Sequence, residues 1–125
     1  MDKKPLRKMR KFGLIGKNIS YSFSRGYFNN KFESESIKNV SYQNFDLDSL
    51  KEFKSIFKDY SEISGLNVTI PYKENIIEYL DSLSKTAKKI GAVNTIKITK
   101  KGKLKGYNTD YYGFRKSLED RKSVV

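Results

Sequence analysis

The chain has 125 residues, enough for one domain with one hydrophobic core. It carries a formal net charge of +12 and contains neither Cys nor His, which excludes a disulfide framework, a thiolate nucleophile, the usual metal ligands of zinc sites and Ser–His catalysis. Acid–base chemistry therefore falls to Lys, Asp, Glu or Tyr, and without a signal peptide or a long apolar run we expect a cytoplasmic protein with no membrane partner.

The positive charge is concentrated at the N-terminus. Residues 1–11 hold six basic groups and one acid, a contribution of +5. The other lysines are scattered, which is typical of a solvated surface. Because no RNA-binding motif accompanies them, we expect no nucleic-acid partner, and a basic RNA-binding protein remains the alternative from a different class.

The first half of the chain alternates predicted strands and helices. Residues 12–16 (FGLIG) form a short apolar run that predicts a buried strand, and a helix begins near Ser24. Residues 40–45 predict a second strand, after which Asp46 or Asp48 can N-cap a helix. The apolar residues of that helix recur at helical spacing: Leu50, Phe53, Ile56, Phe57 and Tyr60.

The next segment predicts a strand and two further helices. Residues 66–70 (LNVTI) read as a third strand. Pro71 follows directly and suits the first turn of a helix, which we place over residues 72–84. Gly91 ends a second, short helical stretch.

The last third predicts a hairpin followed by a helix. Residues 92–108 form the hairpin, with its turn at Lys101 and Gly102, and the helix is entered from Thr109 or Asp110. This order predicts an α/β fold of three layers: a mostly parallel twisted sheet with a C-terminal hairpin and helices on both faces. Ligands of such sheets bind beyond the carboxyl ends of the strands, so we expect one site there.

Hydroxyl groups dominate the loop after the first strand. Ser22 and Ser24 alternate just before a predicted helix, where hydroxyls and the helix N-terminus favour a carboxylate or a polyhydroxylated ligand. Ordinary N-capping of the helix is the alternative.

The segment NVTIPYK carries the second group of candidates. Asn67 and Thr69 point to the same side of the predicted strand. Lys73 lies in the first turn of the predicted helix, where a cation opposes the helix dipole, so either a functional lysine or a solvated surface lysine fits.

Two further candidates lie in the hairpin region. Asn94 is a polar residue in an apolar strand, either a hydrogen-bonded core residue or a ligand contact. Asp110 follows Asn108 and Thr109 at a strand-to-helix junction, where helix capping is the alternative to a functional role. The chain contains no GxGxxG and no P-loop motif, and so no dinucleotide cradle of its own.

Four motifs taken together resemble the substrate-binding N-terminal domain of shikimate dehydrogenases. They are GLIGKNISYSFS, GLNVTIPYKE, IGAVNTI and GYNTDYYGF, in the family's order and spacing over roughly residues 12–118. The resemblance implies a basic N-terminal tail at 1–11, a substrate-binding domain at 12–114 and the start of an interdomain helix at 115–125. We interpret residues 120–125 as a non-native tail, because a common sequencing adapter encodes them, and either Met1 or Met9 as the native start.

The resemblance also implies the activity. The full enzyme reversibly reduces 3-dehydroshikimate to shikimate with NADPH, in the pathway to chorismate and the aromatic amino acids. NADP would be bound by a C-terminal domain missing from these residues, so we expect the chain alone to bind its small-molecule substrate weakly and to be inactive. A quinate/shikimate dehydrogenase and a non-enzymatic basic binding module are the alternatives.

The resemblance assigns roles to the candidate residues. Ser22 and Ser24 would bind the shikimate carboxylate. The ring hydroxyls would be held by Thr69, Asn94 and Asp110, with Asn67 close by. No metal site is implied.

Lys73 would be the catalytic acid/base, paired with Asp110. A lysine can take the alcohol proton if its neutral form is accessible, whereas a neighbouring Asp110 favours the charged form. In the direction of reduction a charged Lys73 serves as acid and stabilises the developing alkoxide.

This chain departs from the family's usual pattern beside the serines. Tyr21 stands where a His is usual, and Asn18 and Arg25 stand where Pro is usual. These departures leave the shape of the carboxylate pocket and the preference for shikimate or quinate open.

Overall fold

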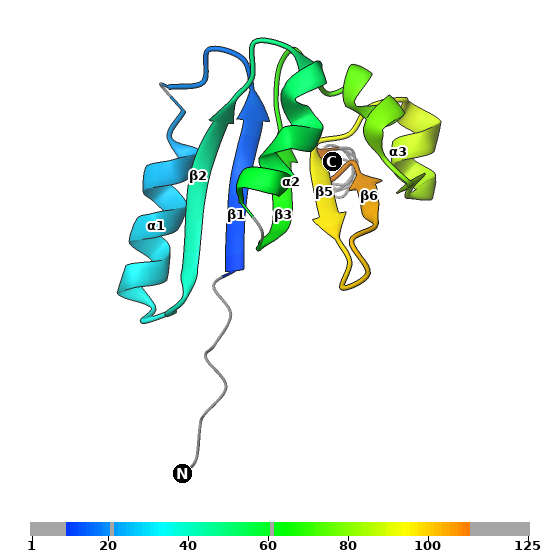
Figure 1. Cartoon of the computed structure of the whole chain (residues 1–125). Helices are drawn as coiled ribbons and strands as arrows, with labels where there is room; N and C mark the ends of the chain where they lie inside the picture. The colour runs from blue at the N-terminus through cyan, green and yellow to red at the C-terminus, as the bar shows by residue number, and fades with distance from the viewer. Residues whose placement is uncertain (1–9, 21, 61, 111–125) are drawn as a thin grey trace, which may run out of the picture.

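The computed structural model describes residues 10–20, 22–60 and 62–110, which form a six-stranded sheet with helices (Figure 1). The strands are β1 (Arg10–Gly16), β2 (Val40–Asp46), β3 (Ile63–Val68), β4 (Ser82–Leu83), β5 (Thr95–Ile98) and β6 (Leu104–Tyr107). The α-helices are α1 (Ser24–Ser34), α2 (Ile56–Asp59) and α3 (Lys85–Ile90), and the 3₁₀ helices are η1 (Leu50–Ser55) and η2 (Asn75–Tyr79). None of the helices in these ranges is long and apolar enough to cross a membrane.

The sheet is mixed, in the order β2-β1-β3-β5-β6-β4. Three of the five pairings are parallel: β1 with β2, β1 with β3, and β4 with β6. Strand β5 runs antiparallel to both β3 and β6. The expected α/β fold with a mostly parallel sheet and a C-terminal hairpin is thereby confirmed.

Helices cover both faces of the sheet, as expected for three layers. On one face Phe53 of η1 and Ile76 of η2 are fully buried, in one core with Ile15 and Ile96 of the strands. On the other face α1 packs beside β2 (Figure 1). There the rings of Phe28 on α1 and Tyr42 on β2 stack with centroids 4.7 Å apart. The neighbouring residues Leu14 and Ile15 of β1 belong to different cores because side chains alternate between the faces of the sheet.

The predicted hairpin and the helix stop at Gly91 are confirmed. Gly102 has a φ of 78° and its N–H donates to the Thr99 carbonyl at 2.9 Å, which closes the turn between β5 and β6. Gly91 also has a φ of 78° and ends α3. Both positions require the left-handed backbone that glycine adopts without a Cβ clash.

The predicted helix over residues 72–84 is wrong. Only η2 is helical there, and Ser82 and Leu83 form β4 instead. The Asp81 N–H donates to the Leu104 carbonyl at 2.9 Å, and its carboxylate accepts from the Leu104 N–H at 2.8 Å. Pairing with β6 therefore prevails over the helical spacing of the apolar residues.

Three boundaries also differ from the predictions. The third strand spans Ile63–Val68 rather than 66–70, and a cis peptide bond joins Ile70 to Pro71, so Pro71 does not begin a helix. Ser49, and not Asp46 or Asp48, caps the next helical segment, which divides into η1 and α2. The helix predicted after Asp110 falls on residues that lie outside the described ranges.

Candidate functional site

The topology brings the predicted site segments to one edge of the sheet. The parallel strands β1 and β3 both end there, followed by the loops with Ser22 and Thr69. Because β5 runs antiparallel to β3, its first residue, Thr95, lies opposite Asn67 at the same edge. Strand β6 reverses once more, so Tyr107 returns to this edge opposite Thr95.

Ser22, Ser24 and Thr69 line a common cavity of about 360 Å³. The Ser22 hydroxyl accepts a hydrogen bond from the Ser24 N–H at 3.2 Å. The N-cap position of α1 is Phe23, which provides no side-chain hydrogen bond, so the Ser22 hydroxyl binds the first N–H of the helix from one residue further upstream. Residues from the β1–α1 connection, from the start of α1 and from the loop after β3 therefore line a single cavity.

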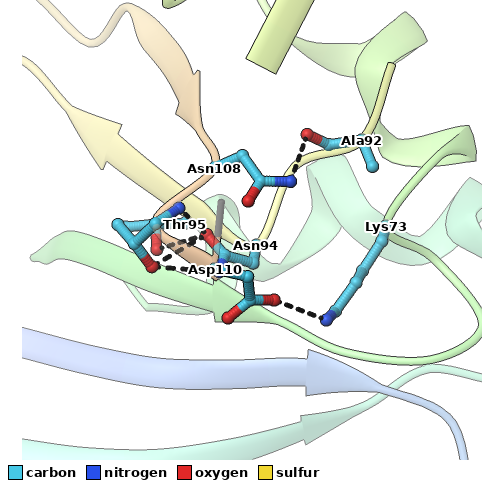
Figure 2. Close-up of polar contacts among 7 residues, drawn as sticks. Lys73, Ala92, Asn94, Thr95, Asn108 and Asp110 are labelled. Atoms are coloured by element: carbon cyan, nitrogen blue, oxygen red, sulfur yellow. Dashed lines mark hydrogen bonds and ion pairs between the residues drawn. The ribbon is translucent and has the colours of Figure 1, made fainter. Parts of the chain in front are cut away.

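Lys73 and Asp110 meet as an ion pair at the exposed end of the sheet. The lysine Nζ points toward the Asp110 carboxylate (Figure 2) and lies 3.1 Å from its Oδ2. The two side chains are 39% and 67% exposed. Lys73 lies in the turns that precede η2, so the prediction that it opposes a helix dipole is wrong. The Lys73 carbonyl accepts from the Val93 N–H at 2.7 Å, which fixes its backbone beside β5.

Asn94 is buried, with 7% of its surface exposed, and holds the chain that leads to Asp110. Its Oδ1 accepts from the Thr109 N–H at 3.0 Å and from the Thr95 hydroxyl at 3.0 Å. Its Nδ2 donates to the Thr109 hydroxyl at 3.0 Å and carries a second hydrogen. Asn94 is thus a hydrogen-bonded core residue, and its remaining donor leaves the ligand reading open.

Asn108 is equally buried and faces the other side of this junction. Its Nδ2 donates to the Ala92 carbonyl at 3.1 Å, as Figure 2 shows. Asn94 and Asn108 together tie the end of β6 to the segment before β5. Asp110 is therefore presented to Lys73 from a junction that two buried amides hold.

Asn67 lies apart from the serine cavity and lines a larger one of about 840 Å³ on the α1 side of the sheet. The Tyr42 hydroxyl donates to Asn67 Oδ1 at 3.0 Å. Burial raises the pKa of Tyr42 to about 12, and a hydrogen bond with the Ser24 side chain acts in the opposite direction. Tyr42 lies outside the four sequence motifs, although a buried tyrosine needs a polar partner for its hydroxyl.

The loop after β1 does not fit a dinucleotide. The loop after β1 begins at Gly16, where a Cβ would lie 2.6 Å from Ile19 Cγ2 and 2.7 Å from Thr69 Cγ2. That glycine serves the packing of the site and leaves no open backbone cradle for a pyrophosphate, unlike a Gly-rich phosphate loop. The loop after β1 is therefore not a dinucleotide-binding turn.

Comparison with known proteins agrees with this arrangement. Residues 14–96 match the family described as the shikimate dehydrogenase substrate binding domain. The NADP(+)-dependent shikimate dehydrogenase of Clostridium botulinum strain Hall is 49% identical over 110 residues, which cover 86% of this chain and 41% of that protein.

Solved structures give the same result. Shikimate dehydrogenase 1 of Peptoclostridium difficile superposes with a TM-score of 0.76 at 41% identity, covering 89% of this chain and 41% of that one. The Thermus thermophilus enzyme in complex with NADP(H) and shikimate superposes with a TM-score of 0.74 at 32% identity, covering 91% and 43%.

The fold and the matched residues define a substrate-binding domain of the α/β class. The chain belongs to the shikimate dehydrogenase substrate binding domain family. It spans about 40% of the length of the curated relatives that it matches.

Proposed function

We propose that this chain is the substrate-binding part of a cytoplasmic NADP-dependent shikimate dehydrogenase, which interconverts 3-dehydroshikimate and shikimate in the shikimate pathway. The observation that carries the proposal is the Lys73–Asp110 pair, 3.1 Å apart, on the same sheet edge as the serine cavity. Matched relatives named for this activity and a neighbour that binds shikimate support it. NADP would be held by a domain outside these residues.

The geometry supports a division of labour within the site. The hydroxyls of Ser22 and Ser24 suit the substrate carboxylate as hydrogen-bond donors. Thr69, with the second amide hydrogen of Asn94, would hold ring hydroxyls, and Asn67 would act from the neighbouring cavity.

Lys73 and Asp110 would handle the proton. Oxidation of the secondary alcohol removes a hydride from carbon and a proton from oxygen. In the reverse direction the charged Lys73 gives the proton to the carbonyl oxygen and stabilises the negative charge that develops there. Asp110, bonded to the lysine Nζ, would orient it and accept a hydrogen bond from a substrate hydroxyl.

Binding is tested on the 125-residue chain itself. We expect shikimate, titrated to millimolar concentration, to shift backbone amide resonances around Ser22, Thr69 and Asp110. Ser22→Ala should weaken binding by about tenfold, the equivalent of one hydrogen bond of about 1.4 kcal/mol to a charged group. Ser34→Ala, at the far end of α1, is the matched control. Absence of any shift with the unmodified chain would overturn the proposal.

The role of Lys73 is tested in a full-length protein that contains these residues. We expect Lys73→Met to lower kcat by at least a hundredfold, because general acid–base catalysis contributes about 10²–10⁴-fold. Lys85→Met, an exposed lysine of α3, controls for the loss of charge. Near-normal turnover of Lys73→Met would refute the assignment.

A further inference from the structure

The loop between β1 and α1, which carries Ser22, is held by hydrogen bonds to an acidic side chain of β2. The Asp46 carboxylate accepts the Asn18 N–H at Oδ1, 2.9 Å away, and the Ile19 N–H at Oδ2, 3.2 Å away. Asn18 has a φ of 57°, the left-handed conformation that Asn tolerates better than most residues. One carboxylate thus holds two successive N–H groups of a strongly curved backbone.

The loop residues that Asp46 holds connect directly to Ser22, which lines the cavity. The Ile19 carbonyl accepts a hydrogen bond from the Ser22 N–H at 2.9 Å and another from Asn44 Nδ2 at 3.2 Å. The side chain of Ile19 is buried in the smaller core. The backbone of Ile19 is consequently held by Asp46 at its N–H and by Asn44 at its carbonyl. Because this carbonyl also binds the Ser22 N–H, Ile19 sets the position of Ser22.

The anchored residues also form the wall of the site. Asn18, Ile19, Ser22 and Ser24 all line the same cavity of about 360 Å³. A shift of the Asn18–Ile19 backbone would therefore change both the cavity wall and the direction of the Ser22 hydroxyl.

Asn18 cannot be exchanged for the proline that the family resemblance favours at this position. Proline fixes φ near −65° and has no N–H, whereas Asn18 has a φ of 57° and donates to Asp46. In this chain the loop geometry thus depends on a carboxylate instead of an imide ring.

We propose that Asp46 is a positioning residue for the substrate carboxylate, acting through Asn18 and Ile19 on Ser22. Asp46 is not among the residues that line the cavity of about 360 Å³, so it acts through the backbone of the loop. This inference rests on the proposed function, because it assigns the shape of the pocket in which Ser22 would bind shikimate.

The experiment titrates shikimate into the 125-residue chain and its variants, followed by amide NMR. We expect Asp46→Ala, which removes both hydrogen bonds to the loop, to raise Kd by about tenfold, the equivalent of about 1.4 kcal/mol. The Kd of Asp46→Asn, which retains one acceptor oxygen, should lie between those of the original chain and Asp46→Ala. The Asn18 and Ile19 amide protons should move upfield in Asp46→Ala. Asp48 is an exposed carboxylate in the same turn. Asp48→Ala should change neither Kd nor the amide proton shifts of Asn18 and Ile19.

A second pair of variants separates positioning from folding. Asn18→Gly keeps the N–H and the left-handed backbone, so its Kd should remain within about twofold of the original. Asn18→Pro should reproduce the loss seen in Asp46→Ala. Denaturant midpoints measured on every variant identify those that remain folded.

The two proposals fail in different ways. A chain that does not bind shikimate at all refutes the proposed function. Unchanged Kd in a folded Asp46→Ala or Asn18→Pro variant, with the original chain binding, overturns the positioning role and leaves the function standing.

Discussion

Tyr42 and Asn94 are buried polar side chains that lie behind the exposed site residues. Each uses its hydrogen bonds to join two segments: Tyr42 joins β2 to Asn67 on β3, and Asn94 joins the start of β5 to Thr109. Loss of one partner would leave a buried polar atom unsatisfied, which costs about 1–3 kcal/mol. The positions of the candidate site residues therefore depend on hydrogen bonds of these two buried side chains.

Tyr42 should make the stability of the fold sensitive to high pH. Its pKa of about 12 in the folded protein exceeds the ordinary value of 10.0, so the folded state holds the phenolic proton more tightly than the unfolded chain. The resulting stabilisation is complete below pH 10 and is lost as the pH rises towards 12, by up to about 1.4 kcal/mol per pH unit.

The measurement is urea unfolding between pH 8 and about 11.5. We expect Tyr42→Phe to show a weaker decline in the free energy of unfolding above pH 10 than the original chain. Tyr27→Phe, which removes an exposed hydroxyl on α1, is the control. If the free energy of unfolding falls equally with pH in the original chain and in Tyr42→Phe, Tyr42 is not the source of the pH dependence.

At the scale of elements, competition between helix and sheet decides the segment after Lys73. Ile76, Ile77, Leu80 and Leu83 recur at helical spacing, yet Leu83 pairs with Gly106 in the sheet. A Cβ at Gly106 would lie 2.7 Å from Leu80 Cδ1 and 2.9 Å from Leu83 Cδ2, so the glycine makes this close approach of β4 possible. Tertiary pairing thus overrides a local pattern.

Helix α3 is short enough to depend on its N-cap. The Ser84 hydroxyl accepts the Ala87 N–H at 3.1 Å, and the helix contains six residues. We expect Ser84→Ala to lower the free energy of unfolding by about 1 kcal/mol, because an orphan N–H loses its partner. Urea denaturation measures the change, with Ser82→Ala on β4 as the exposed control. An effect no larger than that of Ser82→Ala would contradict the capping role.

At the scale of the whole molecule, like charges repel one another. The net charge is +12, and within the described ranges the contact between Lys73 and Asp110 is the ion pair that the structure contains. Repulsion among unpaired surface charges destabilises a compact state and is screened over about 10 Å at 0.1 M salt.

Salt should therefore stabilise this protein. We expect Tm to rise by several degrees between about 10 mM and 0.5 M NaCl, because each kcal/mol corresponds to about 4–8 °C in a domain near 100 residues. Scanning calorimetry at constant pH measures it, and Na₂SO₄ at equal ionic strength tests for specific anion binding. A falling Tm would mean that favourable ion pairs outweigh the repulsion.

By itself the sequence determined strands β1, β2 and β3 to within three residues and the hairpin of β5 and β6, but not β4, which it predicted as helix. Apolar runs such as FGLIG and the glycines at 91 and 102 act locally, through side-chain alternation and backbone freedom. The four ordered motifs predicted the family, which the match over residues 14–96 confirmed.

Only the tertiary structure decided what depends on distant partners. Lys73 and Asp110 are 37 residues apart, and their local surroundings fitted a surface charge and a helix cap equally well. Tyr42 can bind Asn67, and Asp46 can bind the Asn18 N–H, because β2 lies beside β1 in the sheet. Long-range pairing sets which polar groups meet, and neither propensity nor spacing encodes that information locally.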